Sequence, residues 1–246
     1  MDNEMNMSMF TTPNNFQYSA IEIDNLDCDS YTIVNVLVDT TSSIFGFEDK
    51  LESCLKEILD SCKKHPRAEN LLLRVAYFNS RDGIVEAHGF TLIETINGDD
   101  YKIVCNGCTP LYDAALDCIE TTEAHAKTLS DQEYSSNGIF FILTDGEENS
   151  SRTQSASAVK DALNALRKSE HCESIKAFLV GINDDDPGVK SALSSFEKEV
   201  KFDDYIKLGD ATSSKLAKLA QWISQSISSQ SQAINSGQSQ NINFNL

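Results

Sequence analysis

Five oxygen-bearing side chains occupy positions in this sequence where chemistry is expected. Asp39 ends a strongly apolar run, residues 31–38, and Thr41 and Ser43 follow it at alternate positions. Asp145 ends a second apolar run that starts at residue 137, and Thr109 lies in a loop just before a proline. Two carboxylates and three hydroxyls, without His or Cys, form the kind of ligand set that hard divalent cations prefer. These residue types therefore predict a site for Mg²⁺, with Mn²⁺ or Ca²⁺ as substitutes.

Each segment taken alone also has an ordinary structural explanation. Asp39 and Ser43 could cap the helix that follows them, because Asp and Ser are common N-cap residues. Asp145 followed by a glycine is a common strand-to-turn signal. The combination of the three segments is what favours a cation site over helix capping.

The other residues that could carry chemistry are expected to have structural roles. Cys105 and Cys108 have redox or zinc half-site spacing, but no second CxxC pair is present, and a redox role for them stays open. The four histidines are scattered along the chain without paired metal-binding spacing. Residues 184–186, three aspartates, are expected to form a turn and a helix N-cap rather than a calcium loop. Glu147 and Glu148 are interpreted as a solvated rim of the cation site.

Apolar runs of strand length alternate with helical periodicities along most of the chain. This alternation predicts an α/β fold with a doubly wound, Rossmann-like, mostly parallel sheet and helices on both faces. The run at 84–94, after a turn signal at 81–83, predicts one antiparallel edge strand. We expect an N-terminal leader at 1–25, one domain at 26–228, and a disordered tail rich in Ser, Gln and Asn at 229–246.

The predicted sheet would bring the candidate ligands together. In such sheets, ligands bind outside the carboxyl ends of the strands, where the strand order reverses. Asp39 and Asp145 each end a strand, so their carboxylates meet there if the two strands are neighbours. Thr41 and Ser43 lie in the turn that enters the next helix, and Thr109 lies in another loop.

The three segments together resemble the von Willebrand factor A domain, of the intracellular bacterial or phage type. Residues 39–43 match its Asp-x-Ser-x-Ser pattern, with threonine at 41; residues 107–114 and 141–146 are similar to its loop threonine and second aspartate segments. The resemblance covers roughly residues 30–228 and implies a metal-ion-dependent adhesion site. It implies that Thr41 and Ser43 bind the metal directly, that Asp39 and Asp145 bind it directly or through water, and that Thr109 binds directly in the ligand-competent state. The chain departs from the pattern at Thr41, which adds a methyl group, and at Cys108, where a small residue is common.

The composition indicates which kinds of partner and which cellular location to expect. The formal net charge of −18 disfavours nucleic acid, because phosphate binding needs clustered Lys and Arg. No apolar run is long enough to span a membrane, and the N-terminus does not resemble a signal peptide. Seven cysteines, an odd number, disfavour a secreted disulfide framework. The expected location is therefore the cytoplasm, without nucleic-acid or membrane partners.

The favoured function is a non-enzymatic, metal-dependent protein-binding module. Its cation would capture an Asp or Glu from a partner protein, whose carboxylate completes the coordination. The alternative is a regulatory or adaptor subunit of a bacterial assembly containing an AAA+ ATPase, a kinase or a phosphatase. A Mg²⁺-dependent phosphohydrolase is the least favoured hypothesis, because the sequence has neither a P-loop nor a GxSxG motif. The partner, the oligomeric state and the role of the tail cannot be read from the sequence.

Overall fold

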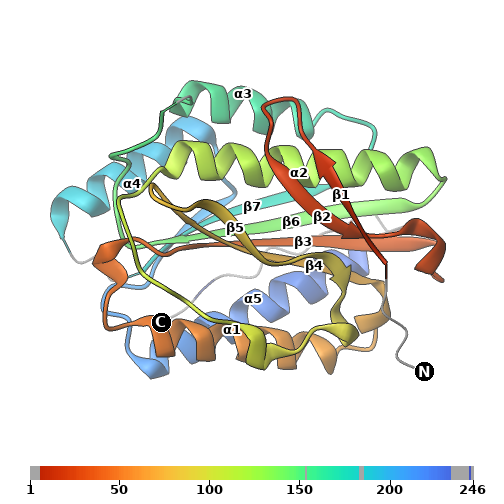
Figure 1. The fold of residues 1–246 in the computed structure, drawn as a ribbon, viewed down its shortest axis with the longest axis horizontal. Coiled ribbons are helices and arrows are strands. Elements are labelled where there is room, and N and C mark those ends of the chain that lie inside the picture. The colour runs from red at the N-terminus through yellow and green to blue at the C-terminus, as the bar shows by residue number, and fades with distance from the viewer. Residues whose placement is uncertain (1–5, 153, 183–185, 234–243, 245–246) are drawn as a thin grey trace.

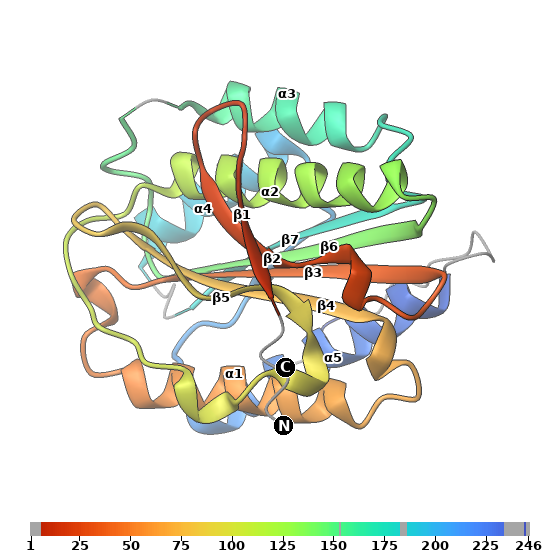
Figure 2. The same cartoon turned by 45° about the vertical axis from the view of Figure 1, so that its right-hand side comes forward.

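A mixed sheet runs through the centre of the molecule (Figures 1 and 2). The computed structural model describes residues 6–152, 154–182, 186–233 and 244. Eight described strands form the sheet in the order β1-β2-β5-β4-β3-β6-β7-β8. The strands are β1 (Met7–Thr11), β2 (Gln17–Ile21), β3 (Ser30–Asp39), β4 (Leu71–Asn79), β5 (Gly83–Leu92), β6 (Ser135–Thr144), β7 (Ile175–Gly181) and β8 (Asp204–Lys207). The α-helices are α1 (Glu48–Lys63), α2 (Leu111–Asp131), α3 (Ala156–Leu166), α4 (Pro187–Val200) and α5 (Ser213–Ala233).

The predicted fold class is confirmed. Strand β3 pairs in parallel with β4 on one side and β6 on the other, and β6, β7 and β8 continue in parallel. Strand β5 is antiparallel to β4, as the turn signal between them predicts. After β3 the chain builds outward to β4, and it later returns to build outward through β6. The strand order therefore reverses between β3 and β6, and a ligand site is expected at their carboxyl ends.

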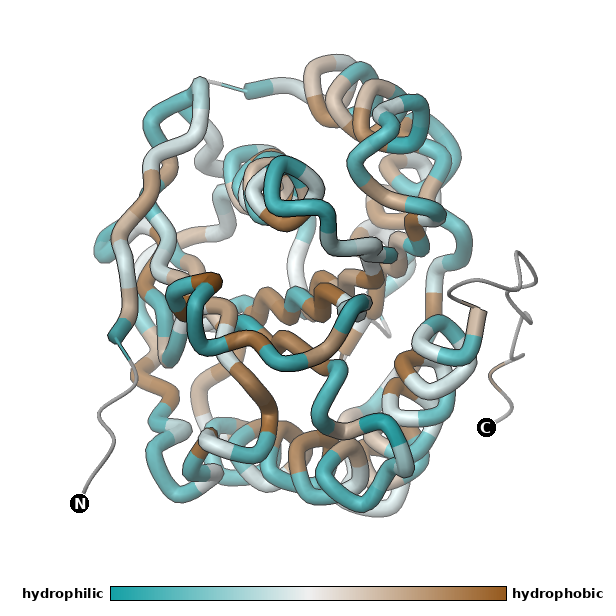
Figure 3. Tube along the Cα trace, turned by 90° about the vertical axis from the view of Figure 1, so that its right-hand side faces the viewer, coloured by the Kyte–Doolittle hydropathy of each residue, from teal (hydrophilic) through white to brown (hydrophobic). Residues whose placement is uncertain are grey.

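Helices cover both faces of this sheet (Figure 1). Helices α1 and α5 lie on one face, and α2, α3 and α4 lie on the other. Strand β3 is buried along its whole length after Ser30, which explains its nearly continuous apolar sequence. In Figure 3 the hydrophobic segments concentrate between the helical layers. Full burial of a large aliphatic or aromatic side chain contributes about 1.5–3 kcal/mol, so these two interfaces hold the fold together.

The N-terminal segment differs from the expected leader. Strands β1 and β2 form an antiparallel hairpin, and β2 pairs with β5 in parallel at Ala20 and Phe90. The hairpin therefore extends the sheet beyond β5. Its inner residues explain why it docks: Tyr18, Ala20 and Ile21 are buried in a cluster with Phe90. The expectation of a loose leader is wrong for residues 7–21, and the start of the domain stays a prediction.

The last helix is longer than expected. It continues to Ala233, so residues 229–233 of the predicted tail are helical. Gln230 holds this end in place, because its side-chain amide donates hydrogen bonds to the carbonyl of Gly138 and the hydroxyl of Ser174. The rest of the predicted tail lies outside the described residues, apart from Phe244. Among the described helices, none combines the length and apolar character that crossing a membrane requires.

Candidate metal site

Asp39 lies at the reversal of strand order. It ends β3, and the register places it beside Thr144, the last residue of β6. The Thr144 hydroxyl donates to Asp39 Oδ2 at 2.6 Å, and the backbone N–H of Thr41 donates to Asp39 Oδ1 at 2.9 Å. The carboxylate is fully buried, and these two bonds fix its orientation.

The hydroxyl groups of the residues that follow Asp39 make contacts in two different directions. Thr41 Oγ1 lies 2.9 Å from Ser43 Oγ, and the Ser43 hydroxyl donates to Asp145 Oδ1 at 2.8 Å. The Thr40 hydroxyl instead donates to the carbonyl of Phe78 in β4. Thr40 therefore contacts β4, whereas Thr41 and Ser43, at the start of a 3-10 turn over Ser42–Ile44, lie toward Asp145. The structure brings Asp39, Thr41, Ser43 and Asp145 to one place.

Thr109 is held beside the same loop through its backbone. Its N–H donates to Asn149 Oδ1 at 2.8 Å, and its carbonyl accepts from the Asn149 N–H at 3.1 Å. A Cβ atom added to Gly146 would lie 3.1 Å from Thr109 Oγ1, so the hydroxyl lies close to the residue after Asp145. Among the described residues, no hydrogen bond joins the Thr109 hydroxyl to the other four side chains. The fifth expected ligand is therefore near the site without being bonded to it.

Backbone hydrogen bonds connect the two loops that carry Thr41 and Thr109. The Ser42 N–H donates to the carbonyl of Gly107 at 3.2 Å, and the Asn106 N–H donates to the carbonyl of Thr40 at 2.8 Å. Gly107 has a φ of +67°, and a Cβ there would lie 2.8 Å from Ser80 Oγ. Glycine is therefore required at 107, both for the left-handed backbone and for the close approach.

The electrostatics of the site suit a cation. The pKa of Asp39 is raised to about 7, chiefly by burial and also by the nearby Asp145, while the bonds from Thr144 and Thr41 oppose the shift. Burial also raises the pKa of Asp145, while the bond from Ser43 lowers it. Two ionised carboxylates in this place are costly, and a divalent ion would remove that cost. The all-oxygen donor set fits such an ion.

The remaining ligands are hydroxyls rather than further acids. Within the described part of the chain, no cluster of three or more His, Cys, Asp or Glu side chains could hold a metal ion. The candidate set has two carboxylates only, Asp39 and Asp145, and it depends on Thr41, Ser43 and Thr109 for its other oxygens. The fit to a cation therefore rests on the geometry of the hydroxyls.

Two positioning residues were missed by sequence reasoning. Glu148 accepts hydrogen bonds from the N–H groups of Tyr112, Ser150 and Ser151, which joins its loop to the first turn of α2. Its interpretation as a solvated rim is wrong, whereas Glu147 is exposed. Asn149 holds Thr109, as described above. No local signal marks this contact, because the start of α2 lies 37 residues before Glu148 in the chain; in space, a carboxylate there is favourable at the positive end of the helix dipole.

The other residues considered from the sequence take structural roles or lie outside the site. All seven cysteines are free thiols. Burial and the neighbouring Glu48 raise the pKa of Cys105 to about 12, so its thiol stays protonated. Asp186 caps α4 by accepting from the N–H groups of Gly188 and Val189, as expected. The two aspartates before it lie outside the described residues.

Comparison with known proteins gives similarity in fold. No protein-family model matches the sequence, and no curated protein matches it. The D319A mutant of the PilB minor pilin from Streptococcus sanguinis superposes with a TM-score of 0.59 at 10% identity, over 89% of this chain and 66% of that one. The pilus adhesin SpaC from Lactobacillus rhamnosus GG, in its open conformation, gives 0.58 at 13% identity, over 93% and 36%. Proximal thread matrix protein 1 from the mussel byssus gives 0.51 at 19% identity, over 82% and 47%.

These similarities establish that the α/β fold is shared. The chain spans between about a third and two-thirds of the length of these three proteins. The identities are too low to carry residue roles from those proteins to this one.

Proposed function

We propose that this chain is a von Willebrand factor A-type domain that binds a divalent cation through Asp39, Thr41, Ser43, Thr109 and Asp145. The observation that carries the proposal is the chain of contacts from Thr41 through Ser43 to Asp145, located where the strand order reverses. A helix cap would not need the second strand-end carboxylate. The buried Asp39 beside it adds the negative charge that a cation requires.

The bound ion would capture a carboxylate from a partner protein. Mg²⁺ takes about six oxygens in octahedral geometry, and five protein groups leave a position for an external oxygen. The role is binding rather than catalysis, and the similarity in fold to a minor pilin and a pilus adhesin supports it. Mg²⁺ is the expected ion, with Mn²⁺ and Ca²⁺ as the alternatives. Thr109 would move onto the metal when the partner binds, and among the described residues no hydrogen bond ties its hydroxyl to the other four candidate ligands.

The test compares two adjacent serines, Ser42 and Ser43, that follow Asp39. Ser43→Ala removes an expected ligand, whereas Ser42→Ala removes an exposed hydroxyl that is not an expected ligand and serves as the matched control. We expect Mg²⁺ titrated into the metal-free protein to give a binding isotherm by calorimetry and a rise in unfolding temperature. Both signals should persist in Ser42→Ala and weaken at least tenfold in affinity in Ser43→Ala.

Two results would contradict the proposal. One is the absence of any Mg²⁺, Mn²⁺ or Ca²⁺ binding to the unmodified protein. The other is equal cation affinity in the two serine variants, which would place the ion elsewhere on this acidic chain.

Two further predictions from the sequence, on cellular location and on assembly, belong to this proposal. The cytoplasmic location stays a prediction; the free state of all seven cysteines is compatible with a reducing compartment. The role of an adaptor subunit beside an ATPase, kinase or phosphatase also stays a prediction.

A further inference from the structure

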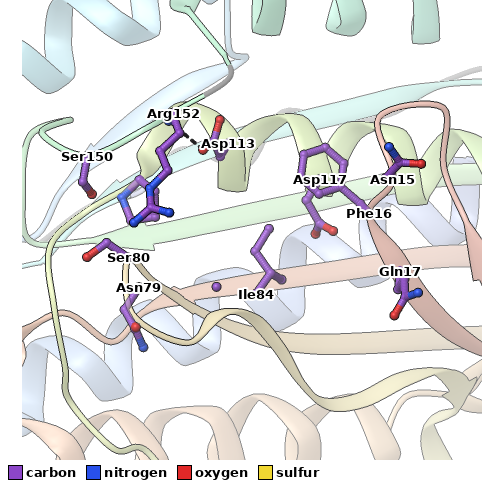
Figure 4. Close-up of a pocket in the computed structure, with 12 residues that line it drawn as sticks. Asn15, Phe16, Gln17, Asn79, Ser80, Ile84, Asp113, Asp117, Ser150 and Arg152 are labelled. Atoms are coloured by element: carbon purple, nitrogen blue, oxygen red, sulfur yellow. Dashed lines mark hydrogen bonds between the residues drawn. The ribbon is translucent and has the colours of Figure 1, made fainter.

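A pocket of about 400 Å³ opens beside the candidate metal site. Figure 4 shows its walls, which come from the β1–β2 turn, the β4–β5 turn, the start of α2 and the loop after β6. The volume is within the range of small-ligand pockets. Its lining residues are Asn15, Phe16, Gln17, Asn79, Ser80, Gly83, Ile84, Pro110, Asp113, Asp117, Ser150 and Arg152.

The pocket and the metal site share loops. Pro110 in the pocket wall directly follows Thr109, and Ser150 directly follows Asn149, which holds Thr109. Asn79 also connects the two, because its side-chain amide donates to the Thr40 hydroxyl at 3.2 Å. A partner segment that reaches the metal would therefore pass the mouth of this pocket.

The end of the pocket nearest the metal site suits an anion. Arg152 is exposed, and its guanidinium forms no ion pair with any described residue, although the chain has 38 acidic residues against 20 basic ones. Figure 4 shows this side chain extending from the loop toward Ser80. The Ser150 Oγ is buried and has no hydrogen-bond partner in the described part of the chain. The first turn of α2 lies at the same wall, where Glu148 and Ser151 already accept from its N–H groups.

The acidic residues of the pocket are already engaged. Asp113 accepts a hydrogen bond from the Arg152 backbone N–H at 3.0 Å. Asp117 is buried and paired with Arg74 at 2.9 Å, and Figure 4 places it away from Arg152, beside Phe16. Arg152 and Asp113 therefore lie at the end of the pocket near the metal site, and the paired Asp117 lies at the end beneath the hairpin turn. An anionic side chain would meet a cationic group of the pocket lining only at Arg152.

We propose that this pocket binds a second carboxylate of the same partner, within three residues of the one that reaches the metal. Arg152 would pair with that carboxylate and Ser150 would donate a hydrogen bond to it, while Pro110 and Ile84 contact its methylene groups. In an extended segment, side chains two residues apart lie about 7 Å apart on one face, which suits two adjacent sites. The proposal rests on the proposed function, because the first carboxylate must be held by the cation.

Synthetic peptides test the proposal without knowledge of the natural partner. Each peptide has one Asp in a Gly/Ser background and, one to three residues away on either side, a Glu, a Gln or a Lys. Binding of these immobilised peptides to the full chain is measured by biolayer interferometry in Mg²⁺ and in EDTA. We expect Mg²⁺-dependent binding, with a Glu peptide at one spacing binding about tenfold more tightly than its Gln counterpart.

Variants of two exposed arginines identify the source of this preference. Arg152→Gln should remove the preference for Glu, and Arg152→Glu should reverse it in favour of the Lys peptide. Arg81→Glu is the matched control, because Arg81 is exposed on the adjacent β4–β5 turn but does not line the pocket. It should keep the preference for Glu. Unfolding midpoints of the variants confirm that each is folded.

The outcomes separate the two proposals. Mg²⁺-dependent binding that does not distinguish Glu from Gln at any spacing, or that Arg152→Glu leaves unchanged, overturns the second-carboxylate pocket and leaves the metal site intact. An equal loss of the Glu preference in Arg81→Glu overturns it too, because general charge on this face would then be the cause. Failure of every peptide to bind in a Mg²⁺-dependent manner counts against the capture of a carboxylate by the metal, and the pocket proposal falls with it.

Discussion

Replacing Asp145 with asparagine is expected to stabilise the metal-free protein while it removes the stabilisation that Mg²⁺ provides. Asparagine keeps an oxygen that can accept the hydrogen bond from Ser43, so the contact at 2.8 Å is retained. What disappears is one of two negative charges in a buried place. Asp39 is fully buried, and Asp145 is among the causes that raise its pKa to about 7.

The magnitude follows from the linkage between pKa and stability. The pKa of Asp39 is about 7 in the folded protein, whereas an aspartate in an unfolded chain has a pKa of about 3.9. Between these values the folded state binds more protons, so this group makes the metal-free protein less stable as the pH rises toward 7. Burial is the largest cause of the shift and the Asp145 charge is a further one; each pKa unit that the charge contributes corresponds to about 1.4 kcal/mol above pH 7.

The assay is urea unfolding of the protein and of Asp145→Asn, near pH 8, in EDTA and in saturating Mg²⁺. In EDTA the variant should be more stable by about 1 kcal/mol. In Mg²⁺ the order should reverse, because an ion present at a hundred times its Kd stabilises the unmodified protein by about 2.7 kcal/mol and the variant by much less. Glu147→Gln is the control, since it removes an exposed charge two residues away and should change neither result.

A variant that is less stable than the unmodified protein in EDTA would refute this reasoning. It would mean that the Asp145 carboxylate contributes more through its hydrogen bond than it costs through repulsion. A variant that keeps the full Mg²⁺ stabilisation would refute its assignment as a ligand.

Three further predictions concern residues around and beneath the site. His125 is buried with both ring nitrogens unpartnered in the described structure, and burial lowers its pKa to about 3. The free energy of unfolding should therefore fall by about 2 kcal/mol between pH 7 and pH 5, because only the unfolded histidine takes up a proton there. Urea unfolding of His125→Phe should lack that pH-dependent component. In Gly146→Ala the new Cβ would lie 3.1 Å from Thr109 Oγ1, so calorimetry should show weaker Mg²⁺ binding. The free energy of unfolding should stay within about 1 kcal/mol of that of the unmodified protein. Arg74→Met should cost about 3–5 kcal/mol in urea unfolding, because it leaves the buried Asp117 carboxylate without its partner at 2.9 Å; a loss below about 1 kcal/mol would contradict this account of the pair.

Local patterns explain why most of the site could be predicted. A nearly continuous apolar run marks β3 as a strand buried on both faces, and the residue after such a run emerges at the edge of the sheet. Asp39 is therefore placed by its strand, and Thr41 and Ser43 lie in the short turn that directly follows it. Asp145 is placed in the same way by β6. These signals lie within a few residues of the candidate ligands, and only the pairing of β3 with β6 needed the tertiary structure.

The parts that could not be predicted depend on contacts between distant residues. Tyr18 and Ala20 in the hairpin become buried only when Phe90 of β5 is in place, and their segment is too short and polar to indicate a strand alone. Glu148 accepts from the backbone N–H of Tyr112, 36 residues earlier in the chain, and a contact of this kind leaves no mark in the sequence. Arg74 lies within an apolar run, and its partner Asp117 lies 43 residues away on a helix.

The two proposed sites depend on different parts of the fold. The cation site is formed by strand ends of the central sheet, so its geometry is set by the most buried elements of the fold. The adjacent pocket needs the β1–β2 turn as its outer wall, and that hairpin lies at the edge of the sheet beyond β5. Changes in the hairpin would therefore alter the far end of the pocket without touching the strand ends that carry Asp39 and Asp145. In the two proposals together, Asp39 and its neighbours determine that a carboxylate is bound, and Arg152 determines which one.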